Sequence, residues 1–371
     1  MAEISTAILS ALAQNFAPQI EKQWNRVCPF LGLLSASGAM GESRGKNVAF
    51  DVEFTGATAG TVAEGSDVAS TEYNSDINVP AIFSYATYRS SFQISEQEVD
   101  IARTSIGSSD AIMNICQDRI LGCSAQLARA IETDALTGTG VDANGNPTLI
   151  GIFGGALSSS GIYGGLNPAT YPEWGSNVLA NGGTLRTLVP DLMAQADGLI
   201  YTAATLPWNI MLSSVGVARR YESMFTTGAY QGTQQALVRM NDNGTSPQYG
   251  MGIPNDGQMQ WSDLYYKGKR VVRDPVSPAN KIAFLNTDLI KVKYLPHVPT
   301  KNEIELFDML GLVGQTGAGS GGAGPIQATS IPVRLVEIAK TGDSHKISMR
   351  VTLAMAVTRR NACALVQDIQ E

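Results

Sequence analysis

The sequence predicts an α+β protein that combines antiparallel strands, one long helix and a compact mixed unit. Residues 46–54 and 346–357 alternate apolar side chains with polar or small ones, which is the period of a strand with one buried face. Residues 109–138 instead repeat apolar side chains every three or four positions, which is the period of a helix. Residues 184–288 alternate short helical and strand patterns, as mixed α/β units do.

The composition indicates a folded protein and excludes several classes of function. The chain has 371 residues, of which 44% are hydrophobic and 16% charged. Two or three folding units are therefore expected, and wholesale disorder is excluded. The 26 Lys and Arg against 33 Asp and Glu give a formal charge of -7. That balance, without any basic run, argues against tight binding to nucleic acid and against an anionic membrane as partner.

Cysteine usage and the N-terminal sequence predict a protein that folds in a reducing cytoplasm. Cys28, Cys116, Cys123 and Cys363 are too few and too scattered for a disulfide scaffold, so reduced core thiols are expected. No stretch is long and apolar enough to predict a membrane span. Glu3 stands where a secretory signal would carry Lys or Arg.

Residues 1–45 are expected to form an N-terminal arm that lies on something else. Ile4, Ile8 and Leu12 recur at the spacing of a short amphipathic helix. The chain after Pro29 is rich in glycine and small residues, so it is expected to bury little surface on its own.

Residues 46–94 predict a β-hairpin with strands at 48–54 and 82–94, joined by a polar, acidic tip at 55–80 that has no Lys or Arg. An isolated hairpin is marginal in water, and so long a loop is unusual inside a compact domain. The hairpin is therefore expected to project and to rest on a neighbouring subunit. The candidate contact residues for that role are Val48, Phe50, Phe54, Glu64, Asp67, Phe83, Tyr85 and Tyr88.

Residues 95–138 predict a long helical region. Ser95 begins a capping-box pattern, and Ser109 can begin the helix again after an interrupting glycine. An apolar stripe then continues over several turns to Ile131, and Gly138 is a suitable residue to end the helix.

The remaining chain divides into three parts. Residues 139–183 are rich in turn-forming residues and are expected to link into the next unit. Residues 184–288 are expected to form the compact mixed unit. Residues 289–371 are expected to be strands, with 346–357 packed on one side and paired with 331–340 across a turn.

No catalytic or ligand-binding pattern has the context that its chemistry requires. Residues 317–322 satisfy G-x-G-x-x-G without a convincing helix behind them, and residues 41–45 satisfy G-x-S-x-G with a loop before and a strand after. The calcium-like run from Asp142 lacks its bidentate Glu, and His297 and His345 are too far apart to seed a zinc site. We therefore expect no enzyme activity, no metal and no cofactor.

Several short segments matter because of their order along the chain. They are Ala-Leu-Thr-Gly-Thr-Gly at 135–140, Ile-Gly-Ile at 150–152, Trp-Asn-Ile-Met-Leu-Ser-Ser at 208–214 with Arg-Arg-Tyr at 219–221, Gly-Lys-Arg-Val-Val at 268–272, and Thr-Arg-Arg-Asn-Ala-Cys-Ala-Leu at 358–365. Together with the order of the larger parts, they resemble the tailed-bacteriophage major capsid protein family, which has the Hong-Kong-97-type capsid fold. The resemblance covers nearly the whole chain.

The resemblance implies a role for each part and for the whole. It assigns an N-terminal arm to 1–45, an extended loop to 46–94, the spine helix of a peripheral domain to 95–138, a link to 139–183, an axial domain to 184–288 and peripheral strands to 289–371. It implies a protein that assembles with copies of itself into pentamers and hexamers of an icosahedral head. That shell would form in the host cytoplasm, become part of the virion, and enclose double-stranded DNA without binding it tightly.

The sequence differs from the type member of that capsid family in two ways that affect which partners are expected. No Lys lies between Lys46 and Lys267, so the loop tip cannot supply the lysine for the type member's covalent cross-links. Non-covalent contacts or a separate cement protein are expected instead. No charged helical preamble precedes the arm, so a separate scaffolding protein is expected, besides a portal protein.

Alternative functions stay open at this point. An encapsulin-like cellular compartment shell would package enzymes instead of a genome, and the DNA or cargo that co-purifies would separate it from a phage head. A tail or baseplate component would form tubes or rings. A cytoplasmic α/β enzyme would form a discrete small oligomer and would need a polar pocket with perturbed titrating groups.

Overall fold

The computed structural model describes residues 28–54, 78–95, 97, 109–226, 265–295, 334–340 and 344–371. The chain divides into two compact units. Among the described residues, one unit draws on the chain from 87 to 131 and from 334 to 352, and the other on the rest. Both helices and strands are present, as the α+β prediction requires.

A six-stranded mixed sheet forms the centre of the larger unit, in the order β7–β15–β11–β8–β10–β9. Its strands are β7 (Asn177–Leu179), β8 (Ile210–Ser213), β9 (Tyr265–Tyr266), β10 (Lys269–Arg273), β11 (Ile282–Leu285) and β15 (Ala364–Val366). β10 runs parallel to β8, whereas β11 runs antiparallel to both β8 and β15. Every residue of β8, β11 and β15 is buried. These continuous apolar runs are typical of strands that are covered on both faces.

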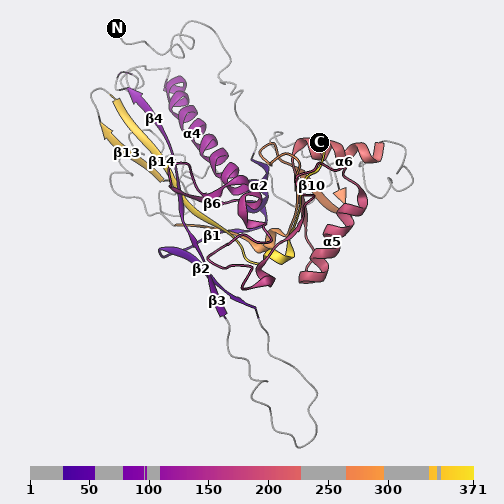
Figure 1. Ribbon diagram of the computed structural model, residues 1–371. Helices are drawn as coiled ribbons and strands as arrows, with labels where there is room; N and C mark the ends of the chain where they lie inside the picture. Colours follow the sequence, from indigo (N-terminus) through magenta and orange to yellow (C-terminus); the bar gives the residue numbers. More distant parts are fainter. Residues whose placement is uncertain are drawn as a thin grey trace, which may run out of the picture. The chain divides into compact units, whose positions relative to one another are not determined.

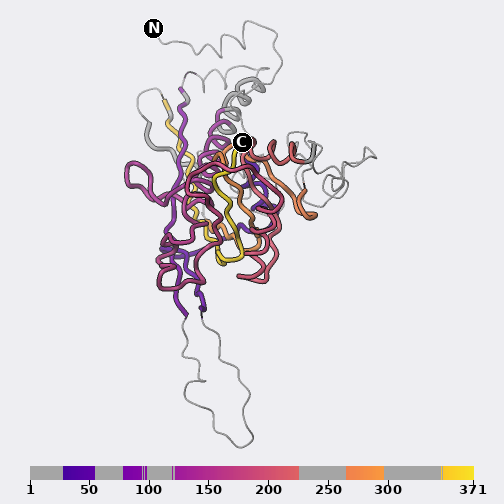
Figure 2. The backbone as a smooth tube through the Cα atoms, turned by 45° about the vertical axis from the view of Figure 1, so that its right-hand side comes forward, coloured from indigo at the N-terminus to yellow at the C-terminus, as the bar shows by residue number. Residues whose placement is uncertain are grey.

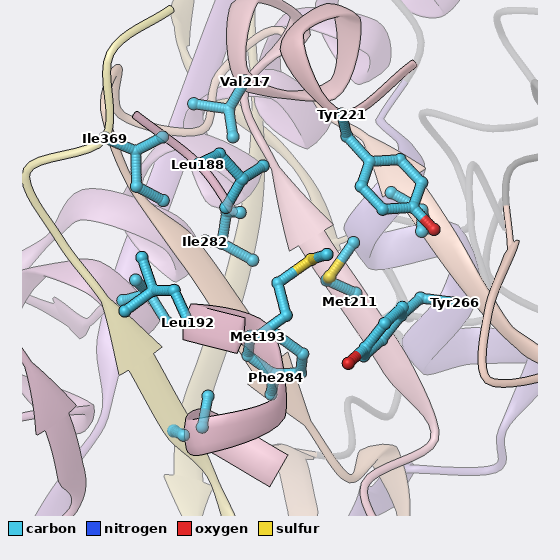
Figure 3. Close-up of a cluster of buried hydrophobic side chains, with 14 of the residues drawn as sticks. Leu188, Leu192, Met193, Met211, Val217, Tyr221, Tyr266, Ile282, Phe284 and Ile369 are labelled. Carbon is cyan, nitrogen blue, oxygen red and sulfur yellow. The ribbon is translucent and has the colours of Figure 1, made fainter. Parts of the chain in front are cut away.

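Helices α5 (Pro190–Ala204) and α6 (Val215–Thr226) pack on this sheet through one apolar core. Figure 3 shows side chains from both helices pointing toward those of the strands. α5 begins with a proline in its first turn, where the missing N–H leaves no helical bond unmade. The core members include Leu192, Met193, Met211, Val217, Tyr221, Tyr266, Ile282, Phe284 and Ile369.

In the other large sheet, β14 (Ser344–Val357) pairs antiparallel with both β12 (Ile290–Tyr294) and β13 (Arg334–Lys340). β1 (Met40–Glu42) runs parallel to β12, and β4 (Ala86–Ser95) pairs with β14. The predicted antiparallel pairing of the last two long strands is therefore present, with Leu335 opposite Met349.

β14 departs from the predicted one-sided packing in its second half. From Leu353 to Val357 every residue is buried, and Ala354 and Ala356, which belong to the other face, are each only 2% exposed. Alanine is small enough to be covered by close neighbours, so an alternation of large and small apolar residues does not report which face meets solvent.

The C-terminal residues also differ from the expected block of strands at 289–371. The short helical turn η6 (Arg360–Ala362) redirects the chain, and β15 then pairs between β7 and β11 in the six-stranded sheet. Figure 2 traces this yellow end of the chain back among the orange strands of the same unit. All of β15 is apolar and buried, which favours a central place in a covered sheet.

Helix α4 (Ser109–Thr137) begins at the predicted serine and ends just before Gly138. The N–H of Gly138 donates to the carbonyl of Asp134, and a Cβ at Gly138 would lie 2.3 Å from the Leu149 carbonyl oxygen. Only glycine fits so close to a backbone, which explains the glycine directly after the helix. Residues 98–108, with most of the predicted earlier turn, lie outside the described residues.

Part of the predicted arm is more buried than its composition suggested. Helix α2 (Pro29–Ala36) lies within residues 28–45, and Phe30, Leu31, Leu33 and Leu34 are at most 3% exposed. The small, glycine-rich composition of the segment masks this short run of large apolar side chains. Residues 1–27 lie outside the described residues.

The hairpin strands are β2 (Asn47–Glu53) and β3 (Asn78–Ser84), which lie side by side in Figure 1. Their antiparallel register places Val48 opposite Phe83 and Glu53 opposite Asn78. The predicted second strand at 82–94 is in fact two strands, because β3 pairs with β2 while β4 pairs with β14. Both have a period of two, so alternation alone does not reveal the change of partner at Tyr85.

Shorter elements complete the described chain. They are the ribbon of β5 (Thr139–Val141) and β6 (Pro147–Ile150), the one-turn helices η2 (Ile152–Ala156) and η3 (Pro172–Trp174), and η5 (Thr287–Leu289). In the ranges that the structure describes, no helix is both long enough and apolar enough to cross a membrane.

Candidate functional site

The ribbon formed by β2 and β3 has two chemically different faces. Along β2, exposed and half-buried residues alternate without a break, so Val48, Phe50 and Val52 share the inner face. The outer face carries the carboxylates of Asp51 and Glu53 together with smaller or apolar residues from both strands, which are Ala49, Pro80 and Ile82. Ile82 is 49% exposed. A strand pair this short is not stable by itself, so its inner face needs a support.

That support is a cluster of aromatic rings. Phe50 stacks on Phe83 across the two strands with ring centroids 5.6 Å apart, and Phe54 stacks on Tyr171 at 4.4 Å. Trp174 lies edge-on to Phe54 at 6.1 Å. Offset-stacked and edge-to-face pairs are the favoured arrangements of aromatic rings, and each adds about 0.5–1.5 kcal/mol beyond the area that it buries.

The backbone of the supporting loop also contacts the hairpin. The N–H of Ile82 donates to the carbonyl of Gly164 at 2.9 Å, so β3 is hydrogen-bonded on this side as well as to β2. Gly164 has a φ of +60°, and a Cβ there would lie 2.7 Å from the ring of Phe83. The left-handed conformation and the close approach of the ring together require glycine at this position.

A buried arginine lies beneath the rings. The guanidinium of Arg360, a residue only 1% exposed, lies 4.9 Å from the centroid of Tyr163 and 5.8 Å from that of Trp174. Its Nε donates to the carbonyl of Ala156 at 2.6 Å, and its Nη2 donates to the carbonyl of Ser158 at 2.6 Å. Longer bonds of 3.4 Å reach the carbonyls of Gly155 and Gly161. The loop from 155 to 161 therefore wraps around one cation.

The electrostatics of this cation follow from its burial. Desolvation lowers the pKa of Arg360 to about 10, so the side chain stays protonated at neutral pH. Among the described residues its partners are carbonyl dipoles and ring faces, which can satisfy a guanidinium through hydrogen bonds and cation–π contacts. Burial raises the pKa of Tyr163, whose neutral hydroxyl accepts a hydrogen bond from the N–H of Val357 at 2.8 Å.

The structure places three of the eight predicted contact residues in the strands of this hairpin and two directly beside them, and several of them point inward. Phe50 and Phe83 belong to the aromatic cluster, and Phe83 is 4% exposed. Phe54 is half-buried against Tyr171. Val48 is half-buried on the same inner face, and the half-buried Tyr85 and Tyr88 lie after β3 and in β4. Glu64 and Asp67 lie outside the described residues.

Sequence reasoning did not identify the anchor that holds the hairpin. Arg360 lies far from residues 47–84 in sequence, and no period or spacing connects it to them. The available signal was compositional, since Tyr163, Tyr171 and Trp174 are large aromatics in an otherwise glycine- and serine-rich segment. Aromatic residues in such a segment indicate that the segment packs against another part of the protein.

The motifs that were set aside have structural roles. The Asp142 carboxylate accepts bonds from the backbone N–H groups of Asn144 and Asn146 and from the Asn146 side chain, which closes the turn between β5 and β6. Residues 41–45 begin within a short strand, β1, instead of after the predicted loop, and β2 comes next where a nucleophile elbow needs a helix. The described residues contain no group of three or more His, Cys, Asp or Glu that could hold a metal. Residues 317–322 lie outside the described residues.

No protein-family model and no curated protein matches the sequence. Solved structures do match it. The chain is similar to the capsid asymmetric unit of cyanophage A-1(L), with 19% sequence identity, a TM-score of 0.71, and coverage of 97% of this chain and 98% of that chain. The capsid of an empty GTA particle matches at 11% identity and a TM-score of 0.54, with 97% of each chain covered. The holo-SrpI encapsulin complex from Synechococcus elongatus matches at 10% identity and a TM-score of 0.53, with 100% of this chain and 97% of that chain covered.

The first of these matches decides the fold, because it spans nearly the full length of both chains. The chain has a phage-capsid fold. This confirms the predicted fold class, which the residue order alone had suggested. At sequence identities of 10–19%, these matches show a shared fold but do not establish the function.

Proposed function

We propose that this chain is a major capsid protein that assembles with copies of itself into pentamers and hexamers of an icosahedral phage head. The observation that carries the proposal is the likeness over nearly the whole chain to a cyanophage capsid structure. The chain's own chemistry agrees, because its net charge of -7 suits a shell that encloses DNA without binding it tightly.

The hairpin supports an assembly role. β2 and β3 form an isolated two-stranded ribbon whose inner face is fixed by aromatic rings and whose outer face presents Ile82, Asp51 and Glu53 to solvent. A ribbon held firmly on one side and left open on the other is suited to contact another molecule. In the proposed shell, this ribbon and the loop from 55 to 77 lie across a neighbouring subunit, and residues 1–27 clasp another one.

The other parts take the roles that the resemblance suggested. Residues 184–288 build the centres of pentamers and hexamers, and the helix and strands of 95–138 and 289–371 form the outer limb. A portal protein and a separate scaffolding protein serve assembly in the host cytoplasm. Non-covalent contacts or a cement protein stabilise the finished head in the virion, since the hairpin strands and tip carry no lysine after Lys46. Shells gain stability from many repeated modest contacts.

An encapsulin-like compartment shell is the second candidate. The observation that favours it is the match to the holo-SrpI encapsulin complex, which also spans nearly the full length of both chains. The cyanophage match has the higher TM-score, 0.71 against 0.53, and ranks the phage head first.

Negative-stain electron microscopy of the purified full chain, alone and with its neighbouring gene products, tests the proposal. We expect closed icosahedral particles or patches of hexamers and pentamers. The nucleic acid and protein that co-purify then separate a phage head from an enzyme compartment. A uniform small oligomer that never assembles would reject both shells, and tubes or rings would indicate a tail component.

A loop replacement tests the role of the hairpin. Because Glu53 pairs with Asn78, residues 55–77 can be exchanged for a short turn of Asn and Gly without disturbing the register of β2 and β3. We expect a folded subunit with an unchanged far-ultraviolet circular dichroism spectrum and no closed particles. The matched control changes the turn at 143–145 between β5 and β6, and it should leave assembly intact. Normal particles from the loop replacement would contradict the proposed contact.

A further inference from the structure

Two buried carboxyl groups meet at the start of helix α2. Glu132 lies near the C-terminal end of α4, Asp274 follows β10, and both residues are 0% exposed. The two carboxyl groups are close enough to affect each other's ionisation. Two ionised carboxylates have only acceptors, so a bond between them requires a proton on one of the two.

The hydrogen-bond inventory around Asp274 indicates the same proton. Its Oδ1 accepts the N–H of Val276 at 2.8 Å, whereas none of the described residues donates a bond to its Oδ2. A buried acceptor without a donor is costly, because it has lost its bonds to water. The proton of a neighbouring carboxylic acid would satisfy it.

Glu132 also fastens α2 to the rest of its unit. Its Oε1 accepts the N–H of Phe30 at 2.8 Å, and its Oε2 accepts the N–H of Leu31 at 2.9 Å. Cys28, which precedes the helix, makes no side-chain cap bond. The carboxyl group of Glu132 therefore accepts N–H groups of the first turn of α2, as the side chain of an N-cap residue usually does.

Among the described residues, the groups that shift the pKa of Glu132 and of Asp274 include no cation. Burial and then the neighbouring Asp274 raise the pKa of Glu132, while the two N–H groups of α2 act in the opposite direction. Burial likewise raises the pKa of Asp274. α2 itself has no titratable side chain. The other titratable groups nearby on the flanking elements are Cys28, Arg129, Asp134, Arg273 and Lys281. Of these, Arg273 forms an ion pair with Glu222 of α6.

We propose that Glu132 and Asp274 share a single proton, and that this proton keeps the first turn of α2 docked. The docking of α2 therefore depends on pH. With the proton, the pair carries one negative charge, which the two helical N–H groups stabilise. Without it, two anions face each other in a buried site, which is unfavourable through both desolvation and repulsion. This device is independent of the proposed capsid function, since it concerns only the folding of one subunit.

The direction of the pH dependence follows from proton binding. The docked helix retains a proton that the undocked chain releases above the ordinary glutamate pKa of 4.5. Docking is therefore strongest below pH 4.5. It weakens as the pH rises from 4.5 toward the raised pKa of Glu132. The ratio of docked to undocked helix falls by up to about tenfold per pH unit in that interval, because one proton is released.

Amide hydrogen exchange of the full chain tests this proposal. Between pH 6 and pH 9, after correction for the intrinsic exchange rate, protection at Phe30 and Leu31 should fall by up to about tenfold per pH unit. Glu132→Gln should abolish that dependence, because its amide does not titrate: the oxygen accepts one of the two N–H groups of α2, and the NH2 group can donate to Asp274 at every pH. Glu173→Gln, at an exposed position in η3, should leave it unchanged.

Infrared difference spectroscopy gives a second readout. Its main observation is made on the wild-type protein and does not require that the variants fold well. The wild-type protein should show the carbonyl stretch of a protonated carboxylic acid at neutral pH, and Asp274→Asn or Glu132→Gln should each remove it. Absence of that band in the wild-type protein, or its persistence in both variants, would overturn the proposal. Protection that depends on added Mg²⁺ or on EDTA would assign a cation to the site and would also overturn it.

Discussion

The six-stranded sheet and the β2–β3 ribbon are stabilised in opposite ways. In the sheet, β8, β11 and β15 are buried along their whole length, and α5 and α6 add a common apolar core. In the ribbon, β2 alternates exposed and half-buried residues, and β3 is its one strand partner among the described residues. The sheet stabilises its own unit, whereas the ribbon depends on a few rings and one arginine.

This difference separates the residues that stabilise the fold from those available for contact with another molecule. Substitutions in the sheet core should unfold the unit. Substitutions at the ribbon anchor should loosen the ribbon while the sheet stays folded, and substitutions on the outer face of the ribbon should affect assembly alone. The expected loss of stability therefore decreases from the sheet core to the ribbon anchor and then to the outer face of the ribbon.

Phe284→Ala should have the largest effect. Phe284 is 0% exposed and meets Trp208 edge-on with ring centroids 5.0 Å apart. Loss of a buried phenylalanine costs about 3–5 kcal/mol, through lost burial and the cavity that remains. Thermal or urea unfolding measures it, and Leu199→Ala on the exposed side of α5 should change stability by less than about 0.5 kcal/mol. Equal losses in the two variants would show that the sheet core is not where stability resides.

Arg360→Met should cost less than this but should act on the ribbon. It leaves the buried carbonyl of Ala156 and the partly buried carbonyl of Ser158 without their donor, which costs about 2–3 kcal/mol. We expect faster amide exchange in β2 and β3 and unchanged exchange in β8 and β11. Arg359→Met is the matched control, because Arg359 is exposed and its bonds, to the Ala204 carbonyl at 3.1 Å and the Asn361 side chain at 3.4 Å, do not reach the loop from 155 to 161. If exchange in β8 and β11 rises equally, Arg360 supports the whole unit and not the ribbon.

Phe54→Ala should destabilise the subunit by about 1–3 kcal/mol, since it removes the stacked contact with Tyr171 and the edge contact with Trp174. Because the ring holds the end of β2, we expect fewer closed particles in electron microscopy at equal protein concentration. Phe54→Tyr keeps the ring and should restore assembly. Assembly at the wild-type level in Phe54→Ala would show that the anchor is dispensable.

Asp197→Asn should have a small, pH-dependent effect on the sheet unit. Partial burial opposes ionisation of Asp197, but bonds from Lys267 at 2.6 Å and Trp208 at 2.5 Å outweigh it and lower its pKa. The pair therefore contributes stability above the ordinary pKa of 3.8 and loses it as the pH falls through the lowered value. Both side chains of the pair are partly exposed to solvent, so we expect at most about 1 kcal/mol at pH 7. Asp191→Asn on the same helix provides the control, and an undiminished difference between wild type and Asp197→Asn at pH 2 would contradict this assignment.

Ile82→Ser should have the smallest effect on stability and a clear effect on assembly. The side chain is 49% exposed on the outer face of the ribbon, so unfolding should change by less than about 0.5 kcal/mol. Light scattering should show slower or incomplete particle formation. Ala49→Ser, at the position opposite Ile82, changes the same face with little loss of apolar area and should assemble normally. Unaltered assembly of Ile82→Ser would place the contact elsewhere.

The sequence determined those features that depend on local periodicity and composition. Alternation located β2 and most of β14, the apolar stripe and Gly138 fixed the end of α4, and the absence of a complete motif argued against a catalytic site. The order of the parts also pointed to the fold that the cyanophage structure later matched. Each inference rests on neighbours in sequence, for which spacing and orientation follow from backbone geometry.

Only the tertiary structure decided which segments meet. The period of two ran unchanged through Tyr85 although β3 and β4 belong to different sheets, and nothing local sent β15 to the six-stranded sheet. The anchor of the ribbon joins Arg360 to Tyr163 and Trp174, and the cap of α2 joins Glu132 to Phe30 across about a hundred residues. Such contacts form because burial selects complementary partners from the whole chain, and a single sequence does not show which partners those are.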